Sequence, residues 1–267
     1  MSLKRSYNGI PVSELKQFLE EKSLQFNNHS FIESDPISVP HLYTHRKDRE
    51  IAGFLAATIA WGRRDLILRS CHRLLDLMDN SPYEFISTAD TKDLERFEGF
   101  VHRTFNGQDC ISFLKGLQKI YSEHESMEEI IVEGMKNNDS VRSGLAALRK
   151  FFFSVSHEKR AEKHFADLMS GAAGKRLLMF LRWMVRSDNR GVDFGIWKKI
   201  RPAQLYIPLD LHSGNTARSL GILTRKQNDW KAVEELTEIL RCFDPDDPVK
   251  YDFALFGLGV NEKFGTR

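Results

Sequence analysis

Lys175 and Asp210 are the two residues of this sequence whose types and positions most favour chemistry. Lys175 directly follows a glycine-rich turn and begins an apolar segment, whereas Asp210 follows Pro208 and begins an amphipathic segment. Both segments are expected to be helices, so each residue would lie at a helix N-terminus. The positive end of the helix dipole and the neighbouring Arg176 disfavour the charged form of the lysine. A neutral amine is a nucleophile suited to Schiff-base formation, and a cleft would bring it to the carboxylate.

Each of these two residues also has a purely structural explanation. An aspartate that precedes an amphipathic segment is a good helix N-cap, which accounts for Asp210 without any chemistry. Lysines at helix starts are usually solvated, which accounts for Lys175 in the same way. The residues taken singly leave both alternatives open.

The turn before Lys175 is a candidate anion site. Gly171 and Gly174 flank two alanines, and such a turn exposes backbone N–H groups ahead of a helix start. It is not a P-loop, which needs four residues between its glycines and a Ser or Thr after the lysine. Further along the same predicted helix, Arg182 and Arg186 are four residues apart and share one face, where they are candidates for phosphate contacts.

The composition is that of an ordinary globular protein. The chain has 267 residues, of which 41% are hydrophobic and 28% charged, enough for one large domain or two modest ones. No apolar run approaches the roughly 20 residues that cross a membrane, and the first residues do not resemble a signal peptide. The three cysteines are isolated and odd in number, as in a reducing compartment. We therefore expect a cytoplasmic protein with no membrane contact, no metal and no cofactor.

The distribution of charge is more informative than the net charge of +2. The range 175–201 contains eight basic and two acidic residues, and the range 229–252 contains eight acidic and three basic residues. Such asymmetry can mark the binding surface for a polyanion. The alternative is that these charges lie on solvated helix faces.

Hydrophobic periodicity predicts an all-α protein of about ten to twelve helices, with no alternation typical of strands. The segment from Glu50 to Trp61 is apolar on all sides and is expected in the middle of a bundle. The other predicted helices include the ranges 11–25, 66–78, 110–121, 127–135, 141–155, 158–169, 175–186, 211–220, 230–241 and 249–258.

The segment IPLDLHSGNTARSLGI resembles the part of helix–hairpin–helix DNA glycosylases in which Pro-x-Asp enters a helix, followed by an Arg and a Leu-Gly pair. In that family the aspartate, here Asp210, is catalytic. A hairpin with glycines precedes it and in bifunctional members carries a nucleophilic lysine, the place held here by Lys175. The resemblance covers about residues 170–259.

The hairpin departs from the usual family pattern. It has no proline, Lys175 follows Gly174 directly, and the spacing from Lys175 to Asp210 is longer than in most members. The irregular hairpin and the long spacing both look more like the archaeal 8-oxoguanine glycosylases. The four-cysteine iron–sulfur motif of the endonuclease III branch is absent from the sequence. The chain is also similar to an uncharacterised conserved bacterial family marked by KRLLMFLRWMVR, IPLDLH and DPVKYDFALFGLG.

The resemblance implies DNA base-excision repair by an N-glycosylase with AP lyase activity. Its substrate would be double-stranded DNA, from which an oxidised purine such as 8-oxoguanine is flipped into a pocket. Lys175 would attack C1′ and form a Schiff base, and Asp210 would assist. The implied DNA contacts, base-stacking aromatics and nucleotide contact are Gly171, Gly174, Arg176, Arg182, Arg186, Trp61, Phe180, Trp183 and His212.

Two other readings stay open. The same scaffold would serve a non-catalytic DNA- or nucleobase-binding protein, in which Lys175 contacts phosphate. A helical protein-interaction domain is the third reading, without a distinctive surface in its favour. Aromatic residues at helical spacing such as Phe180 and Trp183 are more often core residues than stacking platforms.

The resemblance also implies a monomer with two helical subdomains and a cleft between them. Residues 46–199 would form a bundle that carries the hairpin and Lys175. Residues 1–45 and 200–267 would form the second subdomain, which carries Asp210.

Overall fold

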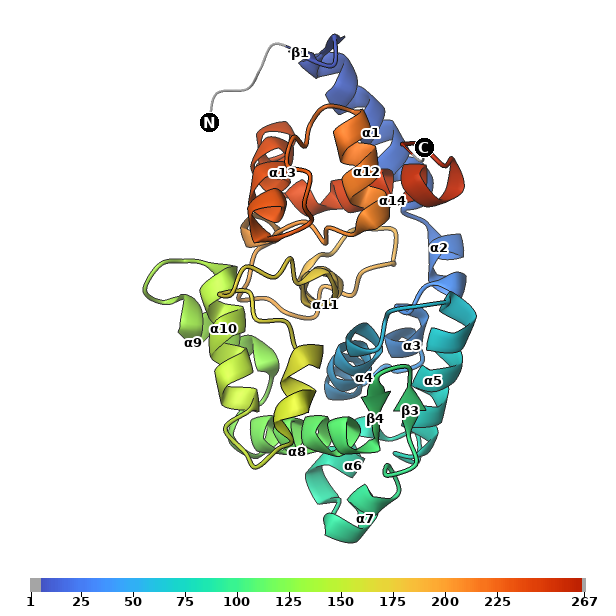
Figure 1. Cartoon of the computed structure of the whole chain (residues 1–267), viewed down its shortest axis with the longest axis vertical. Helices are drawn as coiled ribbons and strands as arrows, with labels where there is room; N and C mark the ends of the chain where they lie inside the picture. The colour runs from blue at the N-terminus through green and yellow to red at the C-terminus, as the bar shows by residue number, and fades with distance from the viewer. Residues whose placement is uncertain (1–5, 266–267) are drawn as a thin grey trace. The chain divides into compact units, whose positions relative to one another are not determined.

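The computed structural model describes residues 6–265. Within this range the chain is mostly helical (Figure 1), which confirms the predicted all-α class. The strands found there form two short antiparallel hairpins, β1 (Ser6–Tyr7) with β2 (Ile10–Pro11) and β3 (Val101–His102) with β4 (Phe105–Asn106).

The chain divides into two compact units, of which the first is discontinuous. Unit 1 consists of residues 1–31 and 170–267, and unit 2 consists of residues 32–169. The family resemblance also implied a discontinuous division, but with Lys175 in the bundle of residues 46–199 and Asp210 in the other subdomain. In the structure both residues belong to unit 1, because the helix that Lys175 begins and the turn before it pack and bond with later elements of that unit.

Unit 2 is built around a helix that is buried along most of its length. This helix, α4 (Arg46–Thr58), has no exposed residue from Glu50 to Thr58, as the apolar sequence predicted. Its Phe54 ring packs within 6.1 Å of the rings of Phe113, Phe152 and Phe165. The surrounding helices are α3 (Ser38–His41), α5 (Arg64–Asp76), α6 (Pro82–Thr88), α7 (Thr91–Glu95), α8 (Gly107–Glu123), α9 (Met127–Met135), α10 (Val141–Phe152) and the 3-10 helix η1 (Lys159–His164); α2 (His29–Ser34) contains the passage from unit 1.

The α-helix predicted over residues 158–169 is wrong. The structure has only the 3-10 helix η1 in this range, and the chain then continues without helix. The side chain of Arg149 donates to the carbonyl of Phe165, and that of Arg142 donates to the carbonyl of Leu168. An α-helix over residues 158–169 would use the carbonyl of Phe165 for the N–H of Met169, whereas the carbonyl of Leu168 would have no partner inside the helix.

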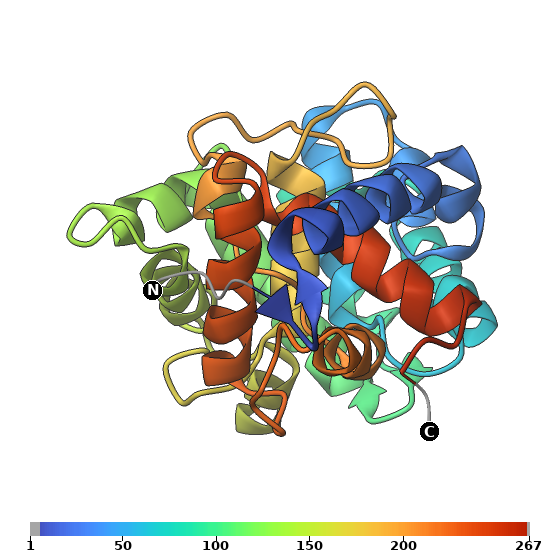
Figure 2. The same cartoon turned by 90° about the horizontal axis from the view of Figure 1, so that it is seen from above.

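Unit 1 contains the helices α1 (Val12–Phe26), α11 (Lys175–Val185), α12 (Leu211–Ser219), α13 (Trp230–Phe243) and α14 (Tyr251–Asn261), with the 3-10 turns η2 (Pro202–Gln204) and η3 (Pro248–Lys250). Helix α14 packs between α1 and α12 (Figures 1 and 2). Two glycines permit this packing, because a Cβ at Gly257 would lie 2.2 Å from the Phe26 ring and one at Gly259 would lie 3.0 Å from Cβ of His212. Helix α11 is buried from Leu177 to Val185.

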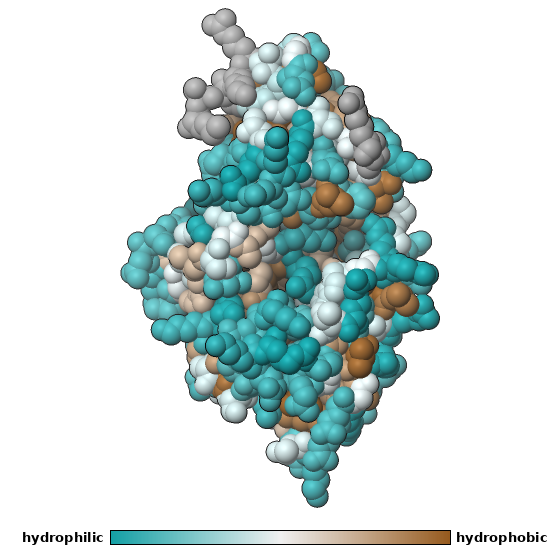
Figure 3. Space-filling model, in the orientation of Figure 1, coloured by the Kyte–Doolittle hydropathy of each residue, from teal (hydrophilic) through white to brown (hydrophobic). Residues whose placement is uncertain are grey.

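Hydrophilic side chains cover most of the face that Figure 3 shows, with hydrophobic residues scattered among them. Among residues 6–265, no helix combines the length and apolar character that a membrane span requires. The same residues contain no cluster of three or more His, Cys, Asp or Glu side chains arranged to hold a metal ion.

Candidate functional site

The structure brings Lys175 and Asp210 together within unit 1. The Nζ atom of Lys175 lies 3.9 Å from Oδ2 of Asp210, and the two side chains are 30% and 20% exposed. Each residue stands at a helix start, as the sequence predicted: Lys175 is the first residue of α11 and Asp210 is the N-cap of α12. An amine and a carboxylate therefore face each other where solvent and a ligand can reach both.

The glycine turn positions Lys175 at the start of its helix. Gly174 has φ 63°, a left-handed conformation that a residue without Cβ adopts at no steric cost, and Gly171 has φ 96°. The turn is tied to the start of α13, because the carbonyl of Gly171 accepts a hydrogen bond of 2.9 Å from the Trp230 N–H and Ala172 forms a β-bridge with Asp229. The N-cap residue of α11 is Gly174, which has no side chain to cap the helix.

Asp210 has two roles that use different oxygens. Its Oδ1 accepts a hydrogen bond of 2.9 Å from the Ser213 N–H, which caps α12, while Oδ2 faces Lys175. Its carbonyl accepts from Nδ2 of Asn228 at 2.9 Å, and Oδ1 of Asn228 accepts from Arg218 at 2.6 Å. The explanation of Asp210 as a helix N-cap is thus correct, and its second oxygen still faces the Lys175 amine.

Arg182 and Arg186 do not fit the expected role in phosphate binding. Their side chains are only 3% and 5% exposed, and four carboxylates surround them, of which those of Asp193 and Asp252 are buried. Arg182 bonds to Asp193 at 3.2 Å and to Asp252, and Arg186 bonds to Asp193 at 3.1 Å, with further bonds to Asp188 and Asp247. The face that these arginines share points into unit 1, because the carboxylates that offset the cost of burying them lie there.

Asp252 joins this buried network to the Lys175–Asp210 pair. It lies in the first turn of α14, is 6% exposed and pairs with Arg182. Burial raises the pKa of Asp252 to about 6, with Arg182 and Lys175 acting to lower it and the Asp210 and Asp193 carboxylates acting to raise it. The sequence analysis missed this residue, since nothing in the DPVKYD segment indicates that its second helical residue faces α11.

The predicted base-stacking aromatics have different surroundings. Phe180 and Trp183 are fully buried in α11, so neither is available to a flipped base, and the interpretation as core residues is correct for both. Trp61 is partly exposed but belongs to unit 2, where its ring stacks on that of His164 at 5.5 Å and meets His102 edge-on at 5.1 Å.

Two other predicted contacts remain accessible in unit 1. His212 is exposed on α12, two residues after Asp210, and its ring meets that of Phe256 edge-on at 6.4 Å. Arg176 is partly exposed beside Lys175, and burial lowers the pKa of its guanidinium to about 10, which leaves it charged at neutral pH.

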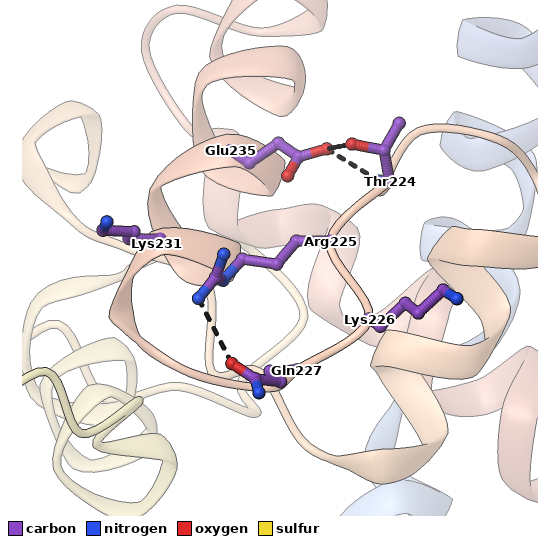
Figure 4. A pocket seen from close by; sticks show the side chains of 6 residues that line it. All are labelled: Thr224, Arg225, Lys226, Gln227, Lys231 and Glu235. Carbon is purple, nitrogen blue, oxygen red and sulfur yellow. Dashed lines mark hydrogen bonds between the residues drawn. The ribbon is translucent and has the colours of Figure 1, made fainter.

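A pocket of about 570 Å³ lies between the loop after α12 and the first turns of α13 (Figure 4), with the lining residues Thr224, Arg225, Lys226, Gln227, Lys231 and Glu235. Glu235 accepts from the N–H and hydroxyl of Thr224, and Arg225 pairs with Asp229. The side chains of Lys226 and Lys231 leave the pocket on opposite sides. The cationic side chains of the pocket are therefore not arranged to bind a single anion.

The chain belongs to the family described as "Protein of unknown function (DUF2400)", which matches residues 35–261. This span includes Lys175, Asp210 and Asp252. No curated protein matches the chain, and no solved structure does. The description of the family names no activity, so the functional proposal depends on the chemistry of the site.

Proposed function

We propose that the protein is a DNA N-glycosylase with AP lyase activity that removes an oxidised purine such as 8-oxoguanine from double-stranded DNA. One observation carries the proposal, namely the 3.9 Å separation between the Lys175 amine and the Asp210 carboxylate at two partly exposed helix starts. This is the pair of groups that a Schiff-base glycosylase of the helix–hairpin–helix type requires. The proposal includes a monomer that acts in the cytoplasm.

In this reaction Asp210 accepts a proton from the Lys175 ammonium, and the neutral amine nitrogen bonds to C1′ of the damaged nucleotide. The bond from C1′ to the base breaks, and the base leaves with the bonding electrons and takes up a proton. Once Asp210 has passed its proton to the departing base, its carboxylate stabilises the positive charge on the sugar. Opening of the sugar ring gives an iminium between Lys175 and C1′, and loss of a C2′ proton then expels the 3′ phosphate.

Borohydride trapping tests the proposal, because it reduces the iminium to a stable bond between protein and DNA. We expect the wild-type protein to give an adduct with a duplex that contains 8-oxoguanine, and Lys175→Gln to give none. Asp210→Asn should slow base release. The matched control is Lys231→Gln, which removes an exposed amine of the same unit and should leave trapping unchanged. Wild-type protein that releases no base and forms no adduct with any lesion duplex would contradict the proposal.

A second candidate is a non-catalytic DNA- or nucleobase-binding protein. The 3.9 Å separation between the two groups also fits this candidate, because an ammonium that pairs with a carboxylate can contact phosphate. A charged ammonium does not attack carbon. Binding that weakens steeply with salt, without any product, would select this candidate.

A further inference from the structure

The β3–β4 hairpin of unit 2 packs beside α5 (Figure 1), and arginine side chains lie around it. Arg73 of α5 donates to a carbonyl of β3 at 3.4 Å, and Arg160 of η1 donates to the carbonyl of Thr104 at 3.2 Å. Arg103 belongs to the turn of the hairpin, and its guanidinium lies beside Gly62, where a Cβ would be 2.8 Å from Nη1. Three parts of unit 2 therefore bring guanidinium groups to one hairpin.

Two more arginines extend this surface along α5. Arg69 and Arg73 are four residues apart and share one face of the helix. Arg63 precedes the helix, and Arg63 and Arg69 pair with Asp65 at 2.9 and 3.2 Å. The arginine surface, as we name it, consists of five exposed residues: Arg63, Arg69, Arg73, Arg103 and Arg160.

The arginine surface has more positive charge than its paired carboxylates neutralise. Two carboxylates, those of Asp65 and Asp109, pair with three of the five arginines, and Asp109 is itself fully buried. Among residues 6–265, Arg73 and Arg103 pair with no carboxylate. A surplus of positive charge on an exposed surface attracts a polyanion.

Contacts within unit 2 hold these arginines before any ligand binds. The Arg73 guanidinium lies 4.7 Å from the centre of the Phe100 ring, and Arg160 is held by its bond to the hairpin carbonyl. Side chains that are already ordered lose less conformational entropy on binding. The planar guanidinium also matches the oxygens of a phosphate in pairs, so five arginines suit the phosphodiesters of a nucleic acid.

Trp61 adds an aromatic ring to this surface. It directly precedes Gly62, which Arg103 contacts, and its carbonyl oxygen lies 3.2 Å from Nε2 of His102 in β3. The residue is partly exposed. Aromatic rings set among cations are typical of surfaces on which nucleic-acid bases stack. The aromatic ring therefore favours a nucleic acid over an acidic peptide.

We propose that the arginine surface binds the phosphate backbone of DNA, with Trp61 in contact with the bound strand. The choice of DNA rests on the proposed function, whereas the surplus of positive charge does not. The surface would supply the phosphate contacts for which Arg182 and Arg186 are too deeply buried.

The test is the salt dependence of the affinity of the full chain for a duplex that contains 8-oxoguanine. Each phosphate contact contributes about 0.9 to the slope of log K against log salt. Replacing two arginines together, Arg73→Gln with Arg103→Gln, should therefore reduce the slope by about 2 and weaken binding at about 0.1 M salt by roughly 10- to 100-fold. Arg73→Lys with Arg103→Lys keeps both charges and should keep the slope.

The matched control removes two other exposed cations of unit 2, by Arg96→Gln with Lys136→Gln. Arg96 pairs with Asp79 and Asp93, and Lys136 pairs with Glu133, so both lie among carboxylates outside the arginine surface. This variant should keep the slope of wild type.

Tryptophan fluorescence gives a second measurement that needs no arginine variant. Of the four tryptophans, Trp183, Trp197 and Trp230 are at most 2% exposed, whereas Trp61 is partly exposed. We expect DNA to quench the fluorescence of wild type, and we expect this quenching to be lost in Trp61→Phe, which keeps an aromatic ring.

The outcomes separate this inference from the proposed function. A slope that survives the loss of both arginines, quenching that persists in Trp61→Phe, or binding to vesicles of anionic lipid but not to DNA would each overturn the inference. Base release by wild type with such a slope would leave the glycosylase function intact. Binding through the arginine surface without base release from any lesion duplex would overturn the glycosylase function and leave the surface intact.

Discussion

The carboxylate of Asp210 holds the start of α12 with one oxygen and faces the amine of Lys175 with the other, although thirty-five residues separate the two in sequence. A helix cap and a reactive carboxylate are often treated as competing explanations for an aspartate. Here the Asp210 side chain caps α12 and also faces the Lys175 amine. Because the cap fixes one of its oxygens, the carboxylate has little freedom to rotate.

Two substitutions of Asp210 separate these roles. Asparagine caps helices about as well as aspartate, so Asp210→Asn should keep the free energy of unfolding within about 0.5 kcal/mol of wild type. Asp210→Ala loses the cap and should cost about 1 kcal/mol. Both should slow base release in a glycosylase assay. Equal stability of the Asn and Ala variants in chemical denaturation would contradict the capping role.

The stability of the protein should depend on pH through Asp252. Its pKa rises from the model-compound value of 3.8 to about 6 on folding, so the native state binds a proton that the unfolded state releases between these values. The stabilising contribution of this protonation is complete below about pH 4 and is lost as the pH rises to about 6. The loss amounts to roughly 3 kcal/mol, because one pKa unit corresponds to 1.36 kcal/mol.

Urea denaturation at several pH values measures this effect. Between pH 4 and 6 the free energy of unfolding of wild type should fall relative to that of Asp252→Asn, and above that range the difference should be constant. Asp246→Asn removes an exposed aspartate of the same segment and should follow wild type. A difference between wild type and Asp252→Asn that does not change with pH would rule out the raised pKa.

Removal of Arg182 should affect folding rather than DNA affinity. Arg182→Met leaves Asp193 and Asp252 buried without this shared donor, and the loss of one partner from a buried ion pair costs about 3–5 kcal/mol. Arg63→Met breaks an exposed pair with Asp65 and should cost less than about 1 kcal/mol. Denaturation curves measure both. An Arg182→Met protein with wild-type stability and weakened DNA binding would restore the phosphate role.

The left-handed conformation of Gly174 limits which residues can precede Lys175. Valine at φ 63° is strained by roughly 1–2 kcal/mol, whereas asparagine adopts this region more readily. We expect Gly174→Val to lower the free energy of unfolding by that amount and Gly174→Asn to lower it less. Gly99→Ala is the control, because a Cβ there meets no atom within 4 Å. Equal stabilities of the two Gly174 variants would show that the turn does not need this conformation.

The fold class and several helices followed from the sequence because they depend on local patterns. The apolar run from Ile51 could be stable only inside a bundle, and the structure buries it in α4. The range 158–169 has a helical pattern as well, but Arg149 of α10 donates to the carbonyl of Phe165, which a helix would use for its own backbone. Such competition comes from another element, so the segment's own sequence cannot reveal it.

The candidate site was likewise predictable only where it depends on local sequence. Glycine, lysine, proline and aspartate signal helix starts, and this allowed Lys175 and Asp210 to be predicted as a pair. The spacing of Arg182 and Arg186 indicated a shared face but not its direction, and the carboxylates that determine this direction come from Asp188, Asp193 and later residues. Asp252 was missed for the same reason, because its partners on α11 lie seventy or more residues earlier in the chain.

The packing of α1 against α14 has a consequence for synthesis on the ribosome. Residues 32–169 are complete, and can collapse, well before α14 emerges, whereas α1 must wait with the apolar side chains of Leu15 and Leu19 uncovered. A nascent chain stalled before residue 251 would therefore have a compact unit 2 and an α1 whose apolar side chains are still exposed. Chaperones that bind exposed apolar segments would then be expected to bind α1.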